Sequence, residues 1–233
     1  MSDTPSISLA AAPVALAAIV VGAAAAVCYG LGKGTVEGCR QVYRMCKDGQ
    51  YPAERLNVVT TCLTNIAGME KTLLSDGFTV KPMSVPSLDV SCPTDMPAIS
   101  LATDGHGRDI FIVNSDSGIT LVSPHLDVTY SAIGDSAAND IVTVLSETGF
   151  TVSVEKRNGE KVITGKDNKK NSLTVNVGAK GNGVIAAIDS RKTKRPTCEK
   201  IHQLIEFELK EKAHAPTHET TRRRMEERGR VKG

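Results

Sequence analysis

Two stretches of the chain, Leu74-Ser-Asp-Gly-Phe-Thr-Val80 and Leu145-Ser-Glu-Thr-Gly-Phe-Thr-Val152, repeat one pattern about seventy residues apart. Each stretch ends a helical pattern, turns at a glycine and continues with Phe-Thr-Val. Glycine readily takes the left-handed conformation that ends a helix, and β-branched residues favour the strand that follows. The repeated pattern therefore predicts two helix-to-strand units in one α+β domain.

The composition limits what the core and the surface can be. Trp is absent and aromatic residues make up 3% of the chain, so the core must consist mainly of aliphatic side chains. The net charge of +2 is too small to indicate nucleic-acid binding by itself. The cysteines form no Cys-x-x-Cys pair. Their spacing favours free thiols in a reducing compartment over a disulfide-stabilised secreted domain.

An uncharged, Ala/Gly-rich stretch extends from Leu9 to Leu31. As a helix it would measure roughly 34 Å, enough to cross a bilayer core of about 30 Å. Lysine and arginine follow this stretch and none precedes it, which predicts a single-pass membrane protein with a cytoplasmic C-terminal domain. We interpret residues 1–47 as this N-terminal hydrophobic helix and residues 48–59 as a linker.

Small residues on one face of this helix predict self-association. Close approach of two helices in a membrane favours glycines spaced by four residues or multiples of four. The residues of this helix-packing face are Gly22, Gly30, Gly34 and Gly38. The alternative is a soluble, cytoplasmic homo-oligomer in which the Ala/Gly-rich helix forms the assembly core.

Residues 60–165 carry the two helix-to-strand units. The apolar spacing predicts helices over residues 61–76 and 137–148, with residues 124–136 as a polar connector between the sheet and the second helix. Turn signals separate three short apolar runs, which predicts an antiparallel meander. Its expected strands are Ala98–Thr103, Ile110–Asn114 and Ile119–Ser123.

The C-terminal part continues with a second group of elements. Asn158-Gly159 predicts a tight hairpin turn. Residues 172–209 predict a further hairpin followed by an amphipathic helix that begins near Cys198. Residues 210–233 show no apolar periodicity and form a basic, charged tail.

Four pieces of the chain carry a resemblance to a known family: Thr60–Phe78, Arg108–Val113, Ser117–Val122 and Val144–Gly159. In their order and turn residues they resemble the uncharacterised conserved chloroplast open-reading-frame family of plastids, cyanobacteria and other bacteria. Residues 172–209 are similar to the small two-strand-plus-helix domain that often accompanies it. Members often occur beside AAA-type ATPases, so the resemblance implies such an ATPase as a protein partner. It implies no catalytic residues.

Basic residues gather near the C-terminal end and form the expected contact site for a protein partner or an anionic lipid. The residues are Arg191, Lys192, Lys194, Arg195, Arg222, Arg223 and Arg224. No aromatic side chains accompany them for base stacking, which argues against nucleic acid.

We identify no catalytic, cofactor-binding or metal-binding residues, because no nucleophile motif or acid–base pair is recognisable in the sequence. The chain is therefore interpreted as a membrane-tethered, non-enzymatic assembly or interaction protein that presents its α+β domain to protein partners. A lesser alternative is an enzyme that holds a divalent metal on neighbouring turns. Its ligands would come from Asp104, His106, Asp109, His125 and Asp127.

Overall fold

The computed structural model describes residues 6–16, 32–47, 55–83, 97–115, 118–169, 171–180, 183–192, 199 and 201–206. Its helices are α3 (Lys33–Lys47), α4 (Ile66–Ser75) and α5 (Leu126–Glu147), with residues 201–206 helical as well. Its strands are β1 (Ser6–Ser8), β2 (Val14–Ala15), β3 (Asn57–Thr60), β4 (Thr79–Pro82), β5 (Ala98–Thr103), β6 (Asp109–Ser115), β7 (Gly118–Ser123), β8 (Thr151–Arg157), β9 (Glu160–Lys166), β10 (Ser172–Lys180) and β11 (Gly183–Lys192).

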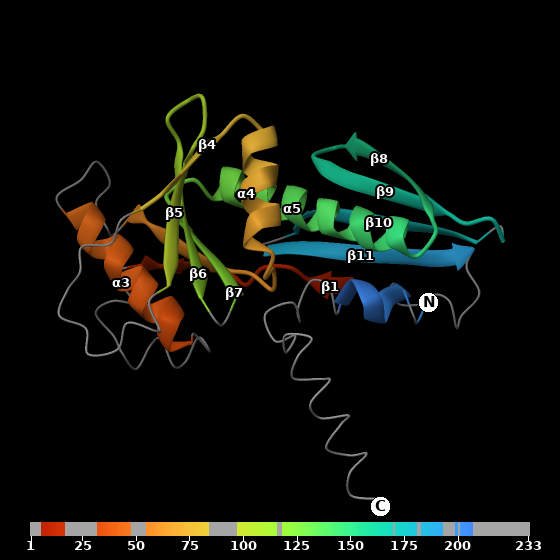
Figure 1. The fold of residues 1–233 in the computed structure, drawn as a ribbon, viewed down its shortest axis with the longest axis horizontal. Coiled ribbons are helices and arrows are strands. Elements are labelled where there is room, and N and C mark those ends of the chain that lie inside the picture. Colours follow the sequence, from red (N-terminus) through yellow and green to blue (C-terminus); the bar gives the residue numbers. More distant parts are fainter. Residues whose placement is uncertain are drawn as a thin grey trace, which may run out of the picture.

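The strands form two antiparallel sheets, and this confirms the predicted α+β class. One sheet has the order β1-β11-β10-β9-β8 and the other β2-β3-β7-β6-β5-β4. Helix α5 lies along the five-stranded sheet and also contacts α4, while α3 packs on β6 of the six-stranded sheet (Figure 1). Each predicted helix-to-strand unit is therefore one helix followed by a four-stranded meander: α4 with β4 to β7, and α5 with β8 to β11.

Alternating residues of the six-stranded sheet divide the apolar interior into two layers. Val59 and Leu121 face α4 and α5, whereas their neighbours Val58 and Val122 face α3. This period of two is the ordinary consequence of side chains pointing to opposite faces of a strand. The larger layer also includes the α5-facing side of the five-stranded sheet, so one apolar core joins the two sheets.

Both glycine turns end their helices by the same hydrogen bonds. The amide of Phe78 donates to Leu73 O at 3.0 Å, and the amide of Phe150 donates to Leu145 O at 3.0 Å. Gly77 and Gly149 have φ of 87° and 86°. A six-residue hydrogen bond around a left-handed glycine is the Schellman motif. The turns predicted from the repeated stretches are thus confirmed in detail.

The N-terminal helix predicted over residues 1–47 is wrong for residues 6–15, whereas Leu16 and residues 33–47 are helical. β1 pairs with β11, and β2 pairs with β3 at the edge of the other sheet. Between them the amide of Leu9 donates to Val184 O at 2.8 Å and the amide of Ala11 donates to Thr60 O at 2.9 Å. The alternation Ser-Ile-Ser-Leu over residues 6–9 favours a strand, because it buries Ile7 and Leu9 on one side.

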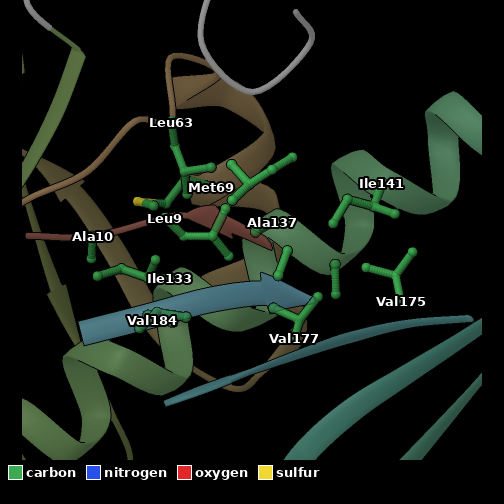
Figure 2. Packing of buried hydrophobic residues seen from close by; sticks show 14 of the residues in the cluster. Leu9, Ala10, Leu63, Met69, Ile133, Ala137, Ile141, Val175, Val177 and Val184 are labelled. Carbon is green, nitrogen blue, oxygen red and sulfur yellow. The ribbon is translucent and has the colours of Figure 1, made fainter. Parts of the chain in front are cut away.

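Figure 2 shows how this N-terminal segment joins the core. Leu9 and Ala10 lie among Leu63, Met69 and Ile133, with Val184 of β11 nearby. Residues 17–31, which make up the rest of the expected membrane span, lie outside the described residues. Among the described helices, none is both long enough and apolar enough to cross a membrane.

Two other predicted boundaries were wrong. α4 begins at Ile66 rather than near Thr61, because Asn65 Oδ1 caps it by accepting from the Gly68 amide at 2.9 Å. Thr61 instead extends the sheet by donating its amide to Ile119 O. α5 begins at Leu126 rather than at residue 137, so it includes most of the expected polar connector.

The predicted meander of β5, β6 and β7 is confirmed, as are the hairpins β8–β9 and β10–β11. β9 and β10 pair with each other, so the five-stranded sheet continues across the domain boundary expected between residues 165 and 172. Of the amphipathic helix expected near Cys198, residues 201–206 are helical, with Ile201 and Ile205 buried. The tail over residues 210–233 lies outside the described residues.

Candidate functional site

A cleft of about 730 Å³ lies where the two helix-and-meander units meet. The end of α4, the β5–β6 turn, the first half of α5 and the end of β8 surround it. We call it the junction cleft. Its charged and titratable lining residues are Asp76, Asp104, His106, Arg108, Asp127, Asp135 and Lys156. Clefts between structural units are common places for ligands, so the partners of these side chains determine what the cleft can bind.

Asp104 holds the β5–β6 turn together. Its Oδ1 accepts from the amides of His106 at 2.9 Å and Arg108 at 2.8 Å, and its Oδ2 accepts from Arg108 Nε at 2.7 Å. These hydrogen bonds, led by that from the Arg108 amide, lower the pKa of Asp104 to about 2. Both carboxylate oxygens of Asp104 therefore accept hydrogen bonds within the turn. We interpret Asp104 as a residue that stabilises this turn.

Arg108 connects the turn to the second unit. Beyond its bond to Asp104, its Nη1 lies 3.4 Å from Asp127 Oδ2 in the first turn of α5. Asp127 is mostly exposed, so this ion pair contributes little, about 0–1 kcal/mol. A carboxylate in the first turn of a helix also interacts favourably with the helix dipole. Arg108 thus links the β5–β6 turn to α5 along the lining of the cleft.

Two carboxyl groups that line the cleft are neighbours in the structure. Asp76, just beyond α4, lies close enough to Asp135 of α5 for the two side chains to influence each other, and Lys161 Nζ of β9 lies 2.8 Å from Asp135 Oδ1. Partial burial, and secondly the neighbouring charge of Asp135, raise the pKa of Asp76. The positive charges of Lys161 and Lys156 lower the pKa of Asp76. Residues from both units thus meet in one charged network.

Asp76→Asn is expected to stabilise the protein at neutral pH. Because the pKa of Asp76 is raised in the folded state, its carboxyl group stabilises the fold fully only at pH values below its unfolded-state pKa near 3.8. This stabilisation is lost as the pH rises through the folded-state pKa. Removing the charge should therefore raise the free energy of unfolding at pH 7 by about 0.5 kcal/mol or less, since the group is largely solvent-screened.

Chemical denaturation of both proteins at pH 7 and pH 3 measures this difference, which should vanish at the lower pH. Asp127→Asn is the matched control, because it removes a carboxylate from a favourable helix N-terminus and should bring no gain. A loss of stability in Asp76→Asn at pH 7 would show that the two carboxylates do not repel each other.

A second hollow of about 500 Å³ lies between α4 and α5. Polar contacts cross it: Asn65 Nδ2 donates to Asp140 Oδ1 at 3.1 Å, and Asn139 Nδ2 donates to Thr72 Oγ1 at 2.9 Å. Asn65 also caps α4, so the same side chain begins one helix and ties it to the other. These contacts fix the angle between the two helices that support the cleft.

β8 is the open edge of the five-stranded sheet. Within the part of the chain that the structure describes, it pairs with β9 alone. All but one of its seven residues are exposed, and the Val154 side chain is 47% exposed. The other edge strands are shorter: β1 has three residues, β2 has two, and β4 has four and ends at Pro82. β8 is therefore the longest edge available among the described strands.

The hairpin turn determines which main-chain groups of β8 point outward. Asn158 and Gly159 have φ of 52° and 82°, the two-residue type I′ turn. In such a hairpin the flanking residues Arg157 and Glu160 bond to each other, and every second residue back along β8 bonds to β9. The intervening residues direct their N–H and C=O groups away from β9. These outward residues are Val152, Val154 and Lys156.

The predicted helix-packing glycines have different positions in the structure. Gly34 and Gly38 lie on α3 against β6, where a Cβ on Gly38 would lie 2.3 Å from Val113 Cγ1 and one on Gly34 would lie 3.1 Å from Ser115 Cβ. Their small size thus serves a contact within the chain. Gly22 and Gly30 lie outside the described residues.

The other predicted residues are spread over the fold. Asp104, His106 and Asp127 line the junction cleft, whereas Asp109 Oδ1 accepts from Thr103 Oγ1 and His125 precedes α5. Among the described residues no three His, Cys, Asp or Glu side chains are grouped as metal ligands. Arg191 and Lys192 end β11. The remaining basic contact residues lie outside the described ranges: Lys194, Arg195, Arg222, Arg223 and Arg224.

Two cysteine thiols lie buried between α3 and the six-stranded sheet. Burial raises the pKa of Cys39 to about 12, and burial together with the charge of Asp109 raises that of Cys46 to about 11. Thiols with such values stay protonated at neutral pH and are poor nucleophiles. Both act as apolar side chains of the smaller core layer.

Sequence reasoning missed four residues of the charged network: Asp76, Asp135, Lys156 and Lys161. In the sequence Asp76 belongs to the first repeated stretch and Asp135 to the expected polar connector. No local pattern places these residues together, because they come from four separate elements. Only the packing of α4 on α5, and of α5 on the β8–β9 hairpin, makes them neighbours.

Comparisons with known proteins add no assignment to this geometry. No family model, no curated protein and no solved structure matches the chain. The resemblance to the conserved chloroplast open-reading-frame family stays a prediction, as does the AAA-type ATPase partner that it implies.

Proposed function

We propose that the chain is a non-enzymatic interaction protein whose partner adds an extended segment to the open edge of β8. The observation that carries this proposal is the edge itself: seven residues in regular pairing with β9 on one side and no paired strand among the described residues on the other. An open edge offers a ready template for main-chain hydrogen bonds. Recognition by strand addition is a recurring mode of protein–protein binding.

The neighbouring surface supports binding by an extended segment. Val154 offers an exposed apolar contact, and Lys156, two residues further on, lines the junction cleft. A segment paired along β8 would therefore gain apolar contact at the middle of the strand and meet charged groups at its end.

The chemistry of the cleft supports binding over catalysis. Asp104 is engaged by the turn that it organises, and Asp135 is engaged by Lys161. A general base or metal ligand needs a carboxylate oxygen available to the reacting group. Asp104 is the first expected ligand of the metal-dependent alternative, and its oxygens are occupied by hydrogen bonds within its own turn.

A display library of extended peptides provides the test. Peptides selected on the wild-type protein should protect the outward amides of Val152, Val154 and Lys156 from hydrogen exchange, and Val154→Pro should weaken their binding at least tenfold. Proline at this position removes an outward N–H and leaves the bonds to β9 intact. The matched control is Leu74→Ala, an exposed apolar residue off the edge, which should bind normally.

The proposal is overturned if the selected peptides bind equally to wild type and Val154→Pro. Circular dichroism and thermal unfolding of Val154→Pro establish that any loss of binding comes from the edge rather than from misfolding.

Membrane attachment is a separate part of the proposed function. Strands β1 and β2 and the segment between them hydrogen-bond to the two sheets, so an anchor would have to use other residues of the chain. Retention of the full chain in membranes through a carbonate wash supports attachment. Release into the wash removes the anchor from the proposal and leaves binding through β8 unaffected.

A further inference from the structure

We infer that the strand that adds to β8 is β8 of a second copy of this chain, paired antiparallel about a two-fold axis at Val154. This inference rests on the proposed function, since it names the partner of the same edge. The resulting assembly would be a dimer whose two five-stranded sheets form one continuous sheet. The register, the charges and the exposed valine each support this choice of partner.

The register follows from the length of β8 and from which of its residues direct their main-chain N–H and C=O groups outward. Val154 is the middle residue of the seven-residue strand, so a two-fold axis there pairs the strand over its whole length. It is also an outward residue, so its N–H and C=O can exchange two bonds with Val154 of the second copy. Outward residues Val152 and Lys156 then meet each other across the axis. The pairing forms about six main-chain hydrogen bonds.

The charged side chains of β8 are compatible with the register centred on Val154 and disfavour the register centred on Glu155. With the axis at Val154, Ser153 lies opposite Glu155 of the second copy and Val152 lies opposite Lys156 of the second copy. No two like charges face each other. Moving the axis to Glu155 shortens the overlap and sets the two Glu155 carboxylates opposite each other, which is destabilising. A shift of one strand by a single residue would set outward-pointing N–H and C=O groups opposite residues whose groups point to β9. The main-chain hydrogen bonds between the two copies could then not form.

The exposed side chain of Val154 supports a second copy of this chain as the partner. Its neighbour on β9, Ile163, is fully buried on the same face of the sheet, whereas Val154 is 47% exposed. Two β-branched side chains directly opposite on one face form a favourable cross-strand pair. A second copy therefore covers with its own valine the apolar side chain that the isolated edge leaves in water.

Cross-linking at the axis tests the register. Val154→Cys would place two Cα atoms about 5.5 Å apart, within the range of a disulfide. Under mild oxidation this variant should form a covalent dimer well above the level of the parent chain. Ser153→Cys is the matched control, because its copies lie on a diagonal about 7–8 Å apart and should cross-link poorly.

Analytical ultracentrifugation over a concentration series completes the test. Wild type should show a monomer–dimer equilibrium, and Val154→Pro should remain monomeric at every concentration while keeping its fold. A dimer unaffected by Val154→Pro, equal cross-linking of the two cysteine variants, or a wild type that is monomeric throughout would each overturn the inference. A monomeric wild type that still binds selected peptides along β8 would leave the proposed function standing with another partner.

Discussion

Leu9→Ala is expected to lower the free energy of unfolding by about 3 kcal/mol, within the range of about 2–5 kcal/mol for buried leucines. Leu9 is fully buried, and it contacts α4 and α5 while its amide bonds to β11. Truncation would leave a cavity at the place where the two sheets share one core. Urea unfolding monitored by circular dichroism measures the change as a shift of the midpoint.

Leu74→Ala provides the matched control, since it makes the same chemical change at a leucine that is 56% exposed. It should change the free energy of unfolding by less than about 0.5 kcal/mol. Equal effects of the two substitutions would contradict the position of Leu9 in the core. They would instead favour an N-terminal segment that contributes nothing to the stability of the sheets.

Gly38→Leu is expected to destabilise the protein by about 3 kcal/mol, because overpacking of a close contact costs about 1–3 kcal/mol and occasionally more. Even a Cβ on Gly38 would lie 2.3 Å from Val113 Cγ1 and 3.1 Å from Pro97 Cγ. Val113 is fully buried, so it has little room to move away. The side chain would push α3 from β6 and open the smaller core layer.

Gly105→Leu is the control for this prediction, because a side chain there meets nothing within 4 Å. Thermal unfolding and sedimentation of both variants separate two roles for Gly38. A contact within the chain predicts a lower unfolding temperature with unchanged self-association. A helix-packing face between copies predicts the reverse, and that outcome would contradict the position of Gly38 against β6.

The repeated stretches were predictable because their structure is local. Every hydrogen bond of the two glycine turns joins residues within one helical turn and its end, for example Phe78 to Leu73. The Asn158-Gly159 hairpin is local for the same reason, since positive φ at both residues selects one turn type. Such elements depend little on the rest of the fold.

The N-terminal segment was mispredicted because an apolar run does not by itself distinguish a helix from a buried strand. Alternation over residues 6–9 was the available signal for a strand, and Pro13 disfavours the interior of a helix. What decides the outcome is distant: Val184 and Thr60 accept the amides of Leu9 and Ala11. Those partners could not be identified from the local sequence.

The junction cleft was not predicted, although three residues of the expected metal site line it. Asp104, His106 and Asp127 were grouped because they lie on turns close in sequence, and the structure does place them around one cleft. The Asp76–Asp135 pair and Lys161 join residues from α4, α5 and β9, whose arrangement depends on tertiary packing. The start of α5 was missed because its exposed polar residues masked the spacing of Val128, Ala132 and Ile133, which are buried.

The pairing of β1 with β11 has a consequence for synthesis of the protein. Ile7 lies opposite Ala186, so among the described strands the first in the chain pairs with the last. At about 5–20 residues per second, translation separates the two by on the order of 10 s. Throughout that interval β1 lacks the strand with which it pairs in the finished fold. It is then accessible to chaperones and targeting factors that the finished fold would exclude.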